Sequence, residues 1–407
     1  MRRLFAHRTE ILLFLFSLAV LCAFSGPRLL RQSAAPHFVY QAKAWLEGQL
    51  HLPVEPPNQE DWAKVGDRFY VSFPPFPALV MLPFVALWGY QFIDTFFTCV
   101  FGALNVVLIF LLLCRLSRSG DSPRTERQNL WLALFFGFGT VHFYMAIRGE
   151  VWFTAQTMGV TLACLYLLAA HRARHPFLAG LFLGCGALTR TPLAFAFVYF
   201  LFELVAPDGH FDRDALTRRR GEVLRRGLAF ALPVLALAGV MMWMNAVRFG
   251  NPFEFGHSHL WNNRVNAWVS KYGLFHPRYL EQNLRAAFIA LPTIETRPLR
   301  IGFDGHGMSI FLTTPLLVLL LWPRLRPRLH RALWVTVASV AAPALFYQND
   351  GYFQFGYRFS LDWMPFLFAL LALGGRRMNR WFYLLGFAGV AMGLWGALAF
   401  KGGWLAP

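Results

Sequence analysis

Residues 94–114 read DTFFTCVFGALNVVLIFLLLC, and the chain continues Arg115-Leu-Ser-Arg118. A run of about twenty mostly apolar residues ended by two cations has the length and composition of a helix that crosses a bilayer. Hydrophobic residues make up 57% of the 407 positions and charged residues only 14%. This composition indicates that most of the chain lies in lipid rather than around a soluble core.

Apolar runs of this kind recur along the chain. They lie at 10–27, 94–114, 129–147, 153–171, 176–188, 191–205, 227–247, 308–323, 332–347, 359–374 and 381–399. The first run follows an Arg-rich start without an evident cleavage site, and we interpret it as a retained helix. The sequence therefore predicts an all-α polytopic membrane protein, a single transmembrane domain over 1–407 with about eleven transmembrane helices.

The arginines set the predicted orientation. If the amino terminus is cytoplasmic, the loops on that side hold 22 of the 38 Lys and Arg, as the positive-inside rule requires. The net charge of +17 follows from this bias, and no nucleic-acid motif accompanies it, so no nucleic acid partner is expected. We expect the cytoplasmic (inner) membrane, with the active site on the extracytoplasmic side.

The first of two large external loops is predicted at about 28–93. Its apolar residues between Phe38 and Leu50 recur at helical spacing, which predicts an interfacial helix lying on the membrane surface. The apolar stretch 78–89 is too short for a comfortable span and is also expected to be interfacial.

The second large external loop is predicted at about 248–306. Aromatic and polar residues, including Asn262 and Asn263, mix over 261–272. This mixture fits a sugar or a lipid headgroup, and equally the aromatic belt of any membrane protein. Pro277 is expected to open a second interfacial helix.

Ionisable residues near apolar runs are candidate functional groups, because charge near lipid is costly without a partner or a role. Glu150 lies in a very short predicted external loop, where it either acts in catalysis or pairs with Arg148. Arg190 stands between two apolar runs of about thirteen residues each, at the tip of a predicted broken hairpin.

Arg358 and Asp362 lie four residues apart before an apolar run. They share a helix face, and form an ion pair, if the helix has begun there. Alternatively, the guanidinium of Arg358 binds a phosphate through its two-pronged donor geometry.

The sequence contains one short pattern that could bind a metal. His257 and His259 are two residues apart, with Glu254 nearby, and no HExxH motif is present. No metal ligand is assigned, and a divalent cation stays open as a cofactor.

Four short motifs together resemble the GT-C superfamily of integral membrane glycosyltransferases. Similarity is strongest to the bacterial branch related to protein O-mannosyltransferases and the lipid A aminoarabinose transferase. The motifs are Tyr70-Val-Ser-Phe-Pro-Pro-Phe-Pro-Ala78, Gly186-Ala-Leu-Thr-Arg-Thr-Pro192, Arg248-Phe-Gly-Asn-Pro-Phe-Glu-Phe-Gly256 and Phe355-Gly-Tyr-Arg-Phe-Ser-Leu-Asp362. The resemblance implies a GT-C-like fold and transfer of a sugar, with inversion, from a polyprenyl-phosphate donor to a lipid, glycan or protein acceptor.

Members of this family resemble one another in carrying an acid early in the first external loop. Here no carboxylate stands between Gly26 and Ala44, and His37 occupies about that place. The resemblance therefore leaves three candidates for the general base, which are Glu150, Asp61 and His37.

Arg190 and Arg358 are the predicted cations that neutralise the departing phosphate. Further predicted substrate-binding residues are polar or aromatic positions on the same side, namely Tyr40, Gln41, Glu254, Tyr357 and Asp362. Two other functions stay open: a transporter or flippase of lipid-linked sugars, and a degenerate relative that binds such a lipid without transferring the sugar.

Overall fold

The protein is described by a computed structural model that covers residues 7–261, 267–296 and 299–400. Asn262 and Asn263, singled out above, lie outside these residues. Helices dominate. The α-helices are α2 (Arg8–Ser25), α3 (His37–Leu46), α4 (Phe76–Trp88), α5 (Asp94–Arg118), α6 (Glu126–Phe138), α7 (His142–Ala146), α8 (Val151–Ala170), α9 (Pro176–Ala187), α10 (Phe197–Val205), α11 (Arg213–Arg218), α12 (Arg220–Phe249), α13 (Ala267–Tyr272), α14 (Leu280–Leu284), α15 (Ile310–Thr313), α16 (Leu329–Leu345), α17 (Met364–Leu373) and α18 (Arg380–Ala399).

Short helical turns and four strands connect them. The turns are η1 (Gly26–Leu30), η2 (Gly89–Gln91), η3 (His171–Ala173), η4 (Thr191–Ala196), η5 (His257–His259), η6 (Pro277–Tyr279), η7 (Arg285–Ile289), η8 (Pro315–Leu321) and η9 (Arg358–Asp362). The strands are β1 (Trp62–Val65), β2 (Arg68–Val71), β3 (Thr293–Thr296) and β4 (Leu299–Gly302). The helices expected in the two external loops are present as α3 and α4, and as the helical stretch that begins at Pro277.

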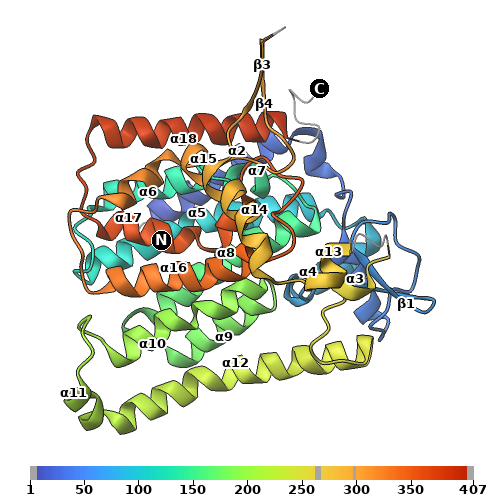
Figure 1. The fold of residues 1–407 in the computed structure, drawn as a ribbon, viewed down its shortest axis with the longest axis horizontal. Helices are drawn as coiled ribbons and strands as arrows, with labels where there is room; N and C mark the ends of the chain where they lie inside the picture. The colour runs from blue at the N-terminus through green and yellow to red at the C-terminus, as the bar shows by residue number, and fades with distance from the viewer. Residues whose placement is uncertain (1–6, 262–266, 297–298, 401–407) are drawn as a thin grey trace.

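The long helices run side by side in one direction, horizontal in Figure 1. α5, α6, α8, α16, α17 and α18 make up the main bundle, and α9, α10 and α12 lie along one side of it. The β1–β2 hairpin, α3 and α13 gather at one end of the bundle, and α11 lies at the other end (Figure 1). All long elements therefore share one axis, which we take as the membrane normal.

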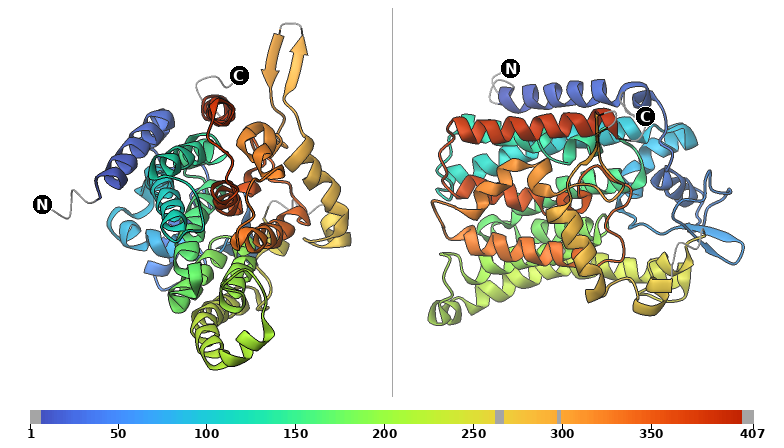
Figure 2. Two further views of the ribbon diagram at one scale, coloured as in Figure 1. Left: turned by 90° about the vertical axis from the view of Figure 1, so that its left-hand side faces the viewer. Right: turned by 45° about the horizontal axis from the view of Figure 1, so that its top comes forward.

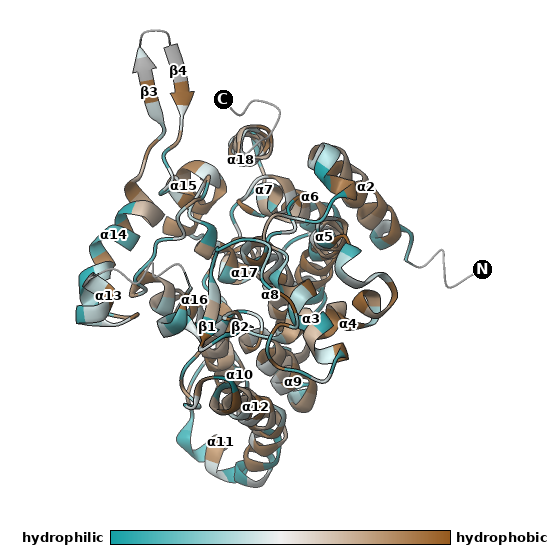
Figure 3. Ribbon diagram, turned by 90° about the vertical axis from the view of Figure 1, so that its right-hand side faces the viewer, coloured by the Kyte–Doolittle hydropathy of each residue, from teal (hydrophilic) through white to brown (hydrophobic). Residues whose placement is uncertain are grey.

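The outermost helices carry a surface suited to lipid. Along one face of α12, Leu224, Leu228, Leu232 and Leu235 are each more than 60% exposed. Such a long exposed apolar stripe is rare on a soluble protein. Figure 3 shows the same apolar character on most helices of the bundle. The chain is thus embedded in a membrane.

Each of the eleven predicted apolar segments contains helix. Among the described residues, however, only five helices are long and apolar enough to cross a membrane by themselves: Arg8–Leu30, Asp94–Arg118, Val151–Ala173, Arg220–Phe249 and Arg380–Ala399. The others are shorter or interrupted, so the predicted number of eleven spans is not confirmed.

Proline accounts for one of the interruptions. The predicted span 308–323 is divided into α15 and η8 at Thr314, whose φ of −139° and ψ of 73° are not helical. Pro315 follows, and a proline disfavours the helical conformation of the residue before it.

Two antiparallel hairpins, β1–β2 and β3–β4, depart from the all-α prediction. In the first, Val65 pairs with Arg68 and only two residues make the turn. Gly66 has a φ of +59°, which glycine adopts without steric cost. The prediction was wrong here because these strands are only four residues long and carry little periodic signal.

The Arg-rich loops meet at the end of the bundle opposite the large loops. Arg328 donates from Nε to Asp121 Oδ1 and from Nη1 to Glu203 Oε2, both at 2.7 Å. These residues come from the loop after α5, from α10 and from the residue before α16, so the ion pairs hold three elements together. The Arg-rich loops and the two large loops thus lie at opposite ends of the bundle, as the positive-inside prediction requires. Which side of the membrane each end faces stays a prediction.

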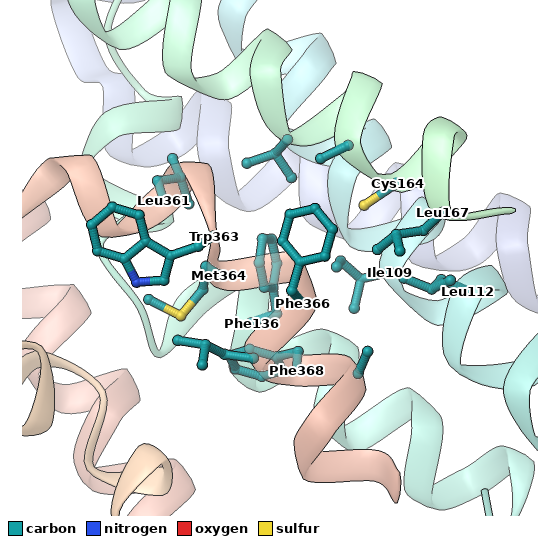
Figure 4. Close-up of a cluster of buried hydrophobic side chains, with 14 of the residues drawn as sticks. Ile109, Leu112, Phe136, Cys164, Leu167, Leu361, Trp363, Met364, Phe366 and Phe368 are labelled. Carbon is teal, nitrogen blue, oxygen red and sulfur yellow. The ribbon is translucent and has the colours of Figure 1, made fainter. Parts of the chain in front are cut away.

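The hydrophobic core lies between α5, α6, α8 and α17. Phe136, Phe366 and Phe368 pack there with Ile109 and Cys164, and all five are buried (Figure 4). Every residue of α17 is buried, as its uninterrupted apolar sequence predicts. This central helix anchors η9, the short turn that directly precedes it.

Candidate active site

The two large loops are joined at the first β-hairpin. The backbone N–H of Trp261 donates to the carbonyl of Trp62 at 2.8 Å, and Ala63 forms an isolated β-bridge with Leu260. Asp61 directly precedes this joined segment. Its position is therefore fixed by both loops, although they are almost 200 residues apart in sequence.

Asp61 has an unusual backbone conformation. Its φ is +56°, in the left-handed region, which non-glycine residues adopt rarely and aspartate more readily than most. Its Oδ2 accepts a 3.0 Å hydrogen bond from Trp152 Nε1, and its carbonyl accepts one of 2.8 Å from Ser72 Oγ. Asp61 is half-buried, and its Oδ1 accepts no hydrogen bond from the part of the chain that the structure describes. Such local strain is typical of functional positions.

His37 supports the turn that carries Asp61. Its ring is fully buried and stacks on Trp62, with centroids 3.7 Å apart. Its Nε2 lies 2.8 Å from the carbonyl of Glu60, so Nε2 is the nitrogen that donates. Burial lowers the pKa of His37 to about 4, and the ring stays neutral at physiological pH.

Arg358 is a buried cation in η9. Its Nε donates to the carbonyl of Gly351 at 2.9 Å, and its backbone N–H donates to Gln354 Oε1 at 2.7 Å. The residue is 6% exposed and forms no salt bridge with any carboxylate among the described residues. Burial lowers its pKa to about 10, so the guanidinium remains charged at neutral pH.

Arg190, not Arg358, is the partner of Asp362. Arg190 donates from Nε to Asp362 Oδ1 at 3.0 Å and from Nη2 to Oδ2 at 2.7 Å. Asp362 is fully buried and this pair is bidentate. The expected alternative, an ion pair between Arg358 and Asp362, is therefore wrong. Gly159 leaves room for Arg190, since a Cβ there would come within 3.0 Å of its Cγ.

One aromatic ring lies beside both arginines. The guanidinium carbons of Arg358 and Arg190 are 5.1 and 5.4 Å from the ring centroid of Phe359, and the ring centroid of Tyr347 is 6.3 Å from it. Asp61 is linked to this place through α8, because Trp152 Nε1 bonds the Asp61 carboxylate and Gln156, one turn later, bonds the carbonyl of Arg358. The two arginines, Asp61 and Tyr347 therefore gather at the end of the bundle that holds the large loops.

Trp152 and Gln156 were missed in the sequence. They are four residues apart on α8 and face the site, because Trp152 binds Asp61 and Gln156 Nε2 donates to the carbonyl of Arg358 at 2.8 Å. A tryptophan and a glutamine on one face of an otherwise apolar helix were the available signal. Tyr347 gave a weaker signal, as an aromatic residue at the end of an apolar run.

Glu150 lies just before α8 and is engaged elsewhere. Arg148 Nη1 donates to Glu150 Oε1 at 3.0 Å, and both side chains are largely buried. Nη2 of the same guanidinium donates to the carbonyl of Phe400. The pairing alternative for Glu150 is thus present in the structure, while its catalytic role stays a prediction.

Glu254 shapes the second loop. Its Oε1 accepts from the backbone N–H of Gly256 at 2.6 Å, and Ser258 Oγ donates to Oε2. His257 stands between these two, and its ring centroid is 6.5 Å from that of Tyr347, so it borders the site. Burial lowers the pKa of His257, and its Nδ1 is buried without a partner in the described structure. The described residues contain no cluster of three or more His, Cys, Asp or Glu that could hold a metal.

The remaining predicted binding residues lie around the site rather than in its centre. Tyr357 is fully buried, and its hydroxyl is 3.4 Å from Asn283 Oδ1. On α3, the ring of Tyr40 contacts Tyr90, and Gln41 is 3% exposed. Their roles in binding stay predictions.

A cavity of about 390 Å³ lies at the opposite, Arg-rich end. Its charged lining includes Glu203 and Arg328, which are already bound to each other. We place the candidate site at the other end, where no described carboxylate pairs with Arg358.

Two solved structures share the fold. The chain is similar to the oligosaccharyltransferase of Archaeoglobus fulgidus in its apo form, with a TM-score of 0.51 and 12% identity over 94% of this chain and 56% of that one. It is also similar to ArnT of Cupriavidus metallidurans bound to undecaprenyl phosphate, with a TM-score of 0.52 and 14% identity over 94% of this chain and 63% of that one. The chain thus spans less than two thirds of either protein. No family model and no curated protein matches it. The chain therefore shares the fold of these two proteins, which agrees with the predicted fold.

Proposed function

We propose that this protein is a glycosyltransferase that transfers a sugar, with inversion, from a polyprenyl-phosphate donor to an acceptor hydroxyl on the extracytoplasmic face. The observation that carries the proposal is the buried Arg358 guanidinium, which has no carboxylate partner among the described residues. α8 links it to Asp61, because Gln156 bonds the carbonyl of Arg358 and Trp152 bonds the Asp61 carboxylate. A buried charge is costly unless it is paired, so Arg358 is suited to a bound anion. The similarity of fold to a polyprenyl-phosphate-binding protein makes a lipid phosphate the leading candidate.

In the proposed reaction, Arg358 holds the donor phosphate through its two Nη groups. The two rings nearest its guanidinium are Phe359 and Phe153, at 5.1 and 5.9 Å. Together with the Nε bond to Gly351, they fix the direction of the guanidinium. Arg190 adds a second positive group close by, but its bidentate pair with Asp362 neutralises much of its charge. Arg358 therefore supplies most of the stabilisation of the leaving phosphate.

Asp61 is the proposed general base. The acceptor oxygen attacks the anomeric carbon, its proton passes to Asp61 Oδ1, and the bonding pair of the sugar–phosphate bond leaves on the phosphate oxygen. The hydrogen bond from Trp152 to Oδ2 orients the carboxylate and leaves Oδ1 available. Glu150 is a weaker candidate because Arg148 already occupies it. His37 is weaker still because its ring is buried against Trp62.

The direct test is incubation of the purified chain in liposomes with a panel of radiolabelled polyprenyl-phosphate sugars. We expect at least one donor to lose its sugar, to water or to an added acceptor, while the lipid remains in its original leaflet. Movement of intact donor between leaflets, without loss of sugar, would support a flippase instead. Saturable donor binding without any loss of sugar would support a degenerate binding protein.

A further inference from the structure

The β3–β4 hairpin stands out from the body of the molecule. In Figure 1 it projects away from the bundle, across the direction of the bundle helices, near the level of the C-terminal end of α18. Figure 2 (left) looks along the helices and shows the hairpin reaching past the outline of the bundle, and Figure 3 shows this from the opposite end. Since the bundle axis is the membrane normal, the hairpin runs parallel to the membrane plane, beyond the protein's own footprint.

This hairpin presents apolar side chains away from the protein. Ile294 pairs directly with Ile301 across the two strands, so both lie on one face. They are 65% and 60% exposed, and on the approach to β3 Ile289 and Leu291 are 67% and 72% exposed. Thr293, on the other face of β3, is a polar position that is also exposed.

Backbone chemistry limits where such a hairpin can lie. A two-stranded hairpin is at best marginally stable in water by itself, and four large exposed apolar residues add to that cost. Deep hydrocarbon is excluded too, because the outer edges of both strands have backbone groups that need hydrogen-bonding partners. The boundary between headgroups and acyl chains meets both requirements, since it offers apolar contact below and polar partners above.

We propose that the β3–β4 hairpin, with Ile289 and Leu291, is a membrane-surface anchor. Its apolar face, marked by Ile294 and Ile301, rests on the headgroup–acyl boundary of the leaflet nearest the large loops. The anchor spreads the protein's contact with that leaflet beyond the helices of the bundle. This inference depends on the membrane embedding and not on the proposed reaction.

A depth measurement on the full chain in liposomes tests this anchor. Ile294→Cys carries a nitroxide label, and Thr293→Cys on the opposite face of the same strand is the matched control. Four native cysteines are buried and Cys22 is partly exposed, so the labelled unsubstituted chain supplies the background spectrum. Collisions with oxygen, which dissolves in lipid, are compared with collisions with a water-soluble nickel chelate.

We expect oxygen to dominate at position 294 and nickel at position 293. The label at 294 should lie roughly 5–10 Å below the headgroup surface. A label at Ile301→Cys, on the neighbouring strand, should also collide mainly with oxygen. Agreement between the two positions would show that the result does not come from one poorly folded variant. Nickel access at 294 and 301 equal to that at 293 would overturn the proposal, and so would a depth near the bilayer centre.

Discussion

Asp362 pairs with Arg190, 172 residues away in sequence, and not with Arg358. The reason is local geometry. Residues 358–362 form a 3₁₀ turn, in which side chains three apart are aligned and those four apart are not. The i, i+4 spacing suggested an ion pair only if an α-helix had already begun. The sequence identified Arg358 as a candidate phosphate-binding residue, but it could not show that Arg358 has no carboxylate partner among the described residues.

Asp61 and Glu150 can be separated by isosteric variants. If Asp61 is the base, Asp61→Asn should lower turnover by roughly a hundredfold or more, because the proton acceptor is lost. Glu150→Gln should leave turnover nearly intact and chiefly lower stability, because the buried guanidinium of Arg148 then loses the negative charge of its carboxylate neighbour. The measurement is turnover of labelled donor, beside melting in detergent. The reverse pattern would return the base to Glu150.

His37 gives the pH dependence of stability. Its pKa falls from about 6.5 in the unfolded chain to about 4 in the folded protein, because burial disfavours the charged ring. Neutral His37 therefore contributes at most roughly 3 kcal/mol to the free energy of unfolding. This contribution is fully present above pH 6.5 and is lost as the pH falls towards 4. His37→Gln keeps a donor for Glu60 without a titrating group, so its melting temperature should vary less between pH 6.5 and 4. Identical pH profiles for the two proteins would contradict this account.

Among the elements, the broken hairpin α9–η4–α10 was predicted correctly from its sequence. Two apolar runs of about thirteen residues around Arg190-Thr-Pro192 indicate a chain that cannot continue as one helix. The structure ends α9 at Ala187 and gives Arg190 an extended conformation, with a φ of −141°. What the sequence could not indicate is the hydrogen bond from Phe76 N–H to the carbonyl of Leu188, at 2.9 Å, which brings the first loop to this break.

The packing of α9 on α12 gives an element-scale prediction. A Cβ at Gly180 would lie 2.0 Å from the carbonyl oxygen of Phe230, so the helices are in close backbone contact. Gly180→Ala should force them apart and lower the free energy of unfolding by about 1–3 kcal/mol. Gly239→Ala, in α12 with nothing within 4 Å, is the matched control and should be neutral or slightly stabilising. Equal melting temperatures of the two variants would show that this contact is looser than described.

At the scale of the whole molecule, the order of the helices and the gathering of the Arg-rich loops at one end of the bundle followed from hydropathy and arginine. The assembly of the site did not. Ala63 and Leu260 meet through a single β-bridge, and no local pattern in either loop encodes that pairing. Hydropathy also does not distinguish an apolar run that forms one complete span from a run that forms a shorter helix packed inside the bundle.

The predicted orientation can be tested with single cysteines and a thiol reagent that does not cross the membrane. Arg218→Cys, in the Arg-rich end, should be shielded in intact cells, because the positive-inside rule places this end in the cytoplasm. Ser258→Cys, exposed in the second large loop, should be labelled. Labelling of both from the same side would contradict the arrangement of the whole fold.

The central claim is that Arg358 holds a lipid phosphate while Asp61 takes a proton. The measurement that tests it most directly is binding of a labelled polyprenyl-phosphate sugar to the purified chain, with turnover followed on the same samples. Arg358→Ala should lose at least about tenfold in donor affinity, the size expected for hydrogen bonds to a charged group. Arg358→Lys should recover only part of it, because an ammonium lacks the planar fork. Asp61→Asn should bind the donor as the unsubstituted chain does, without turnover. Unchanged donor affinity in a well-folded Arg358→Ala variant would contradict the account.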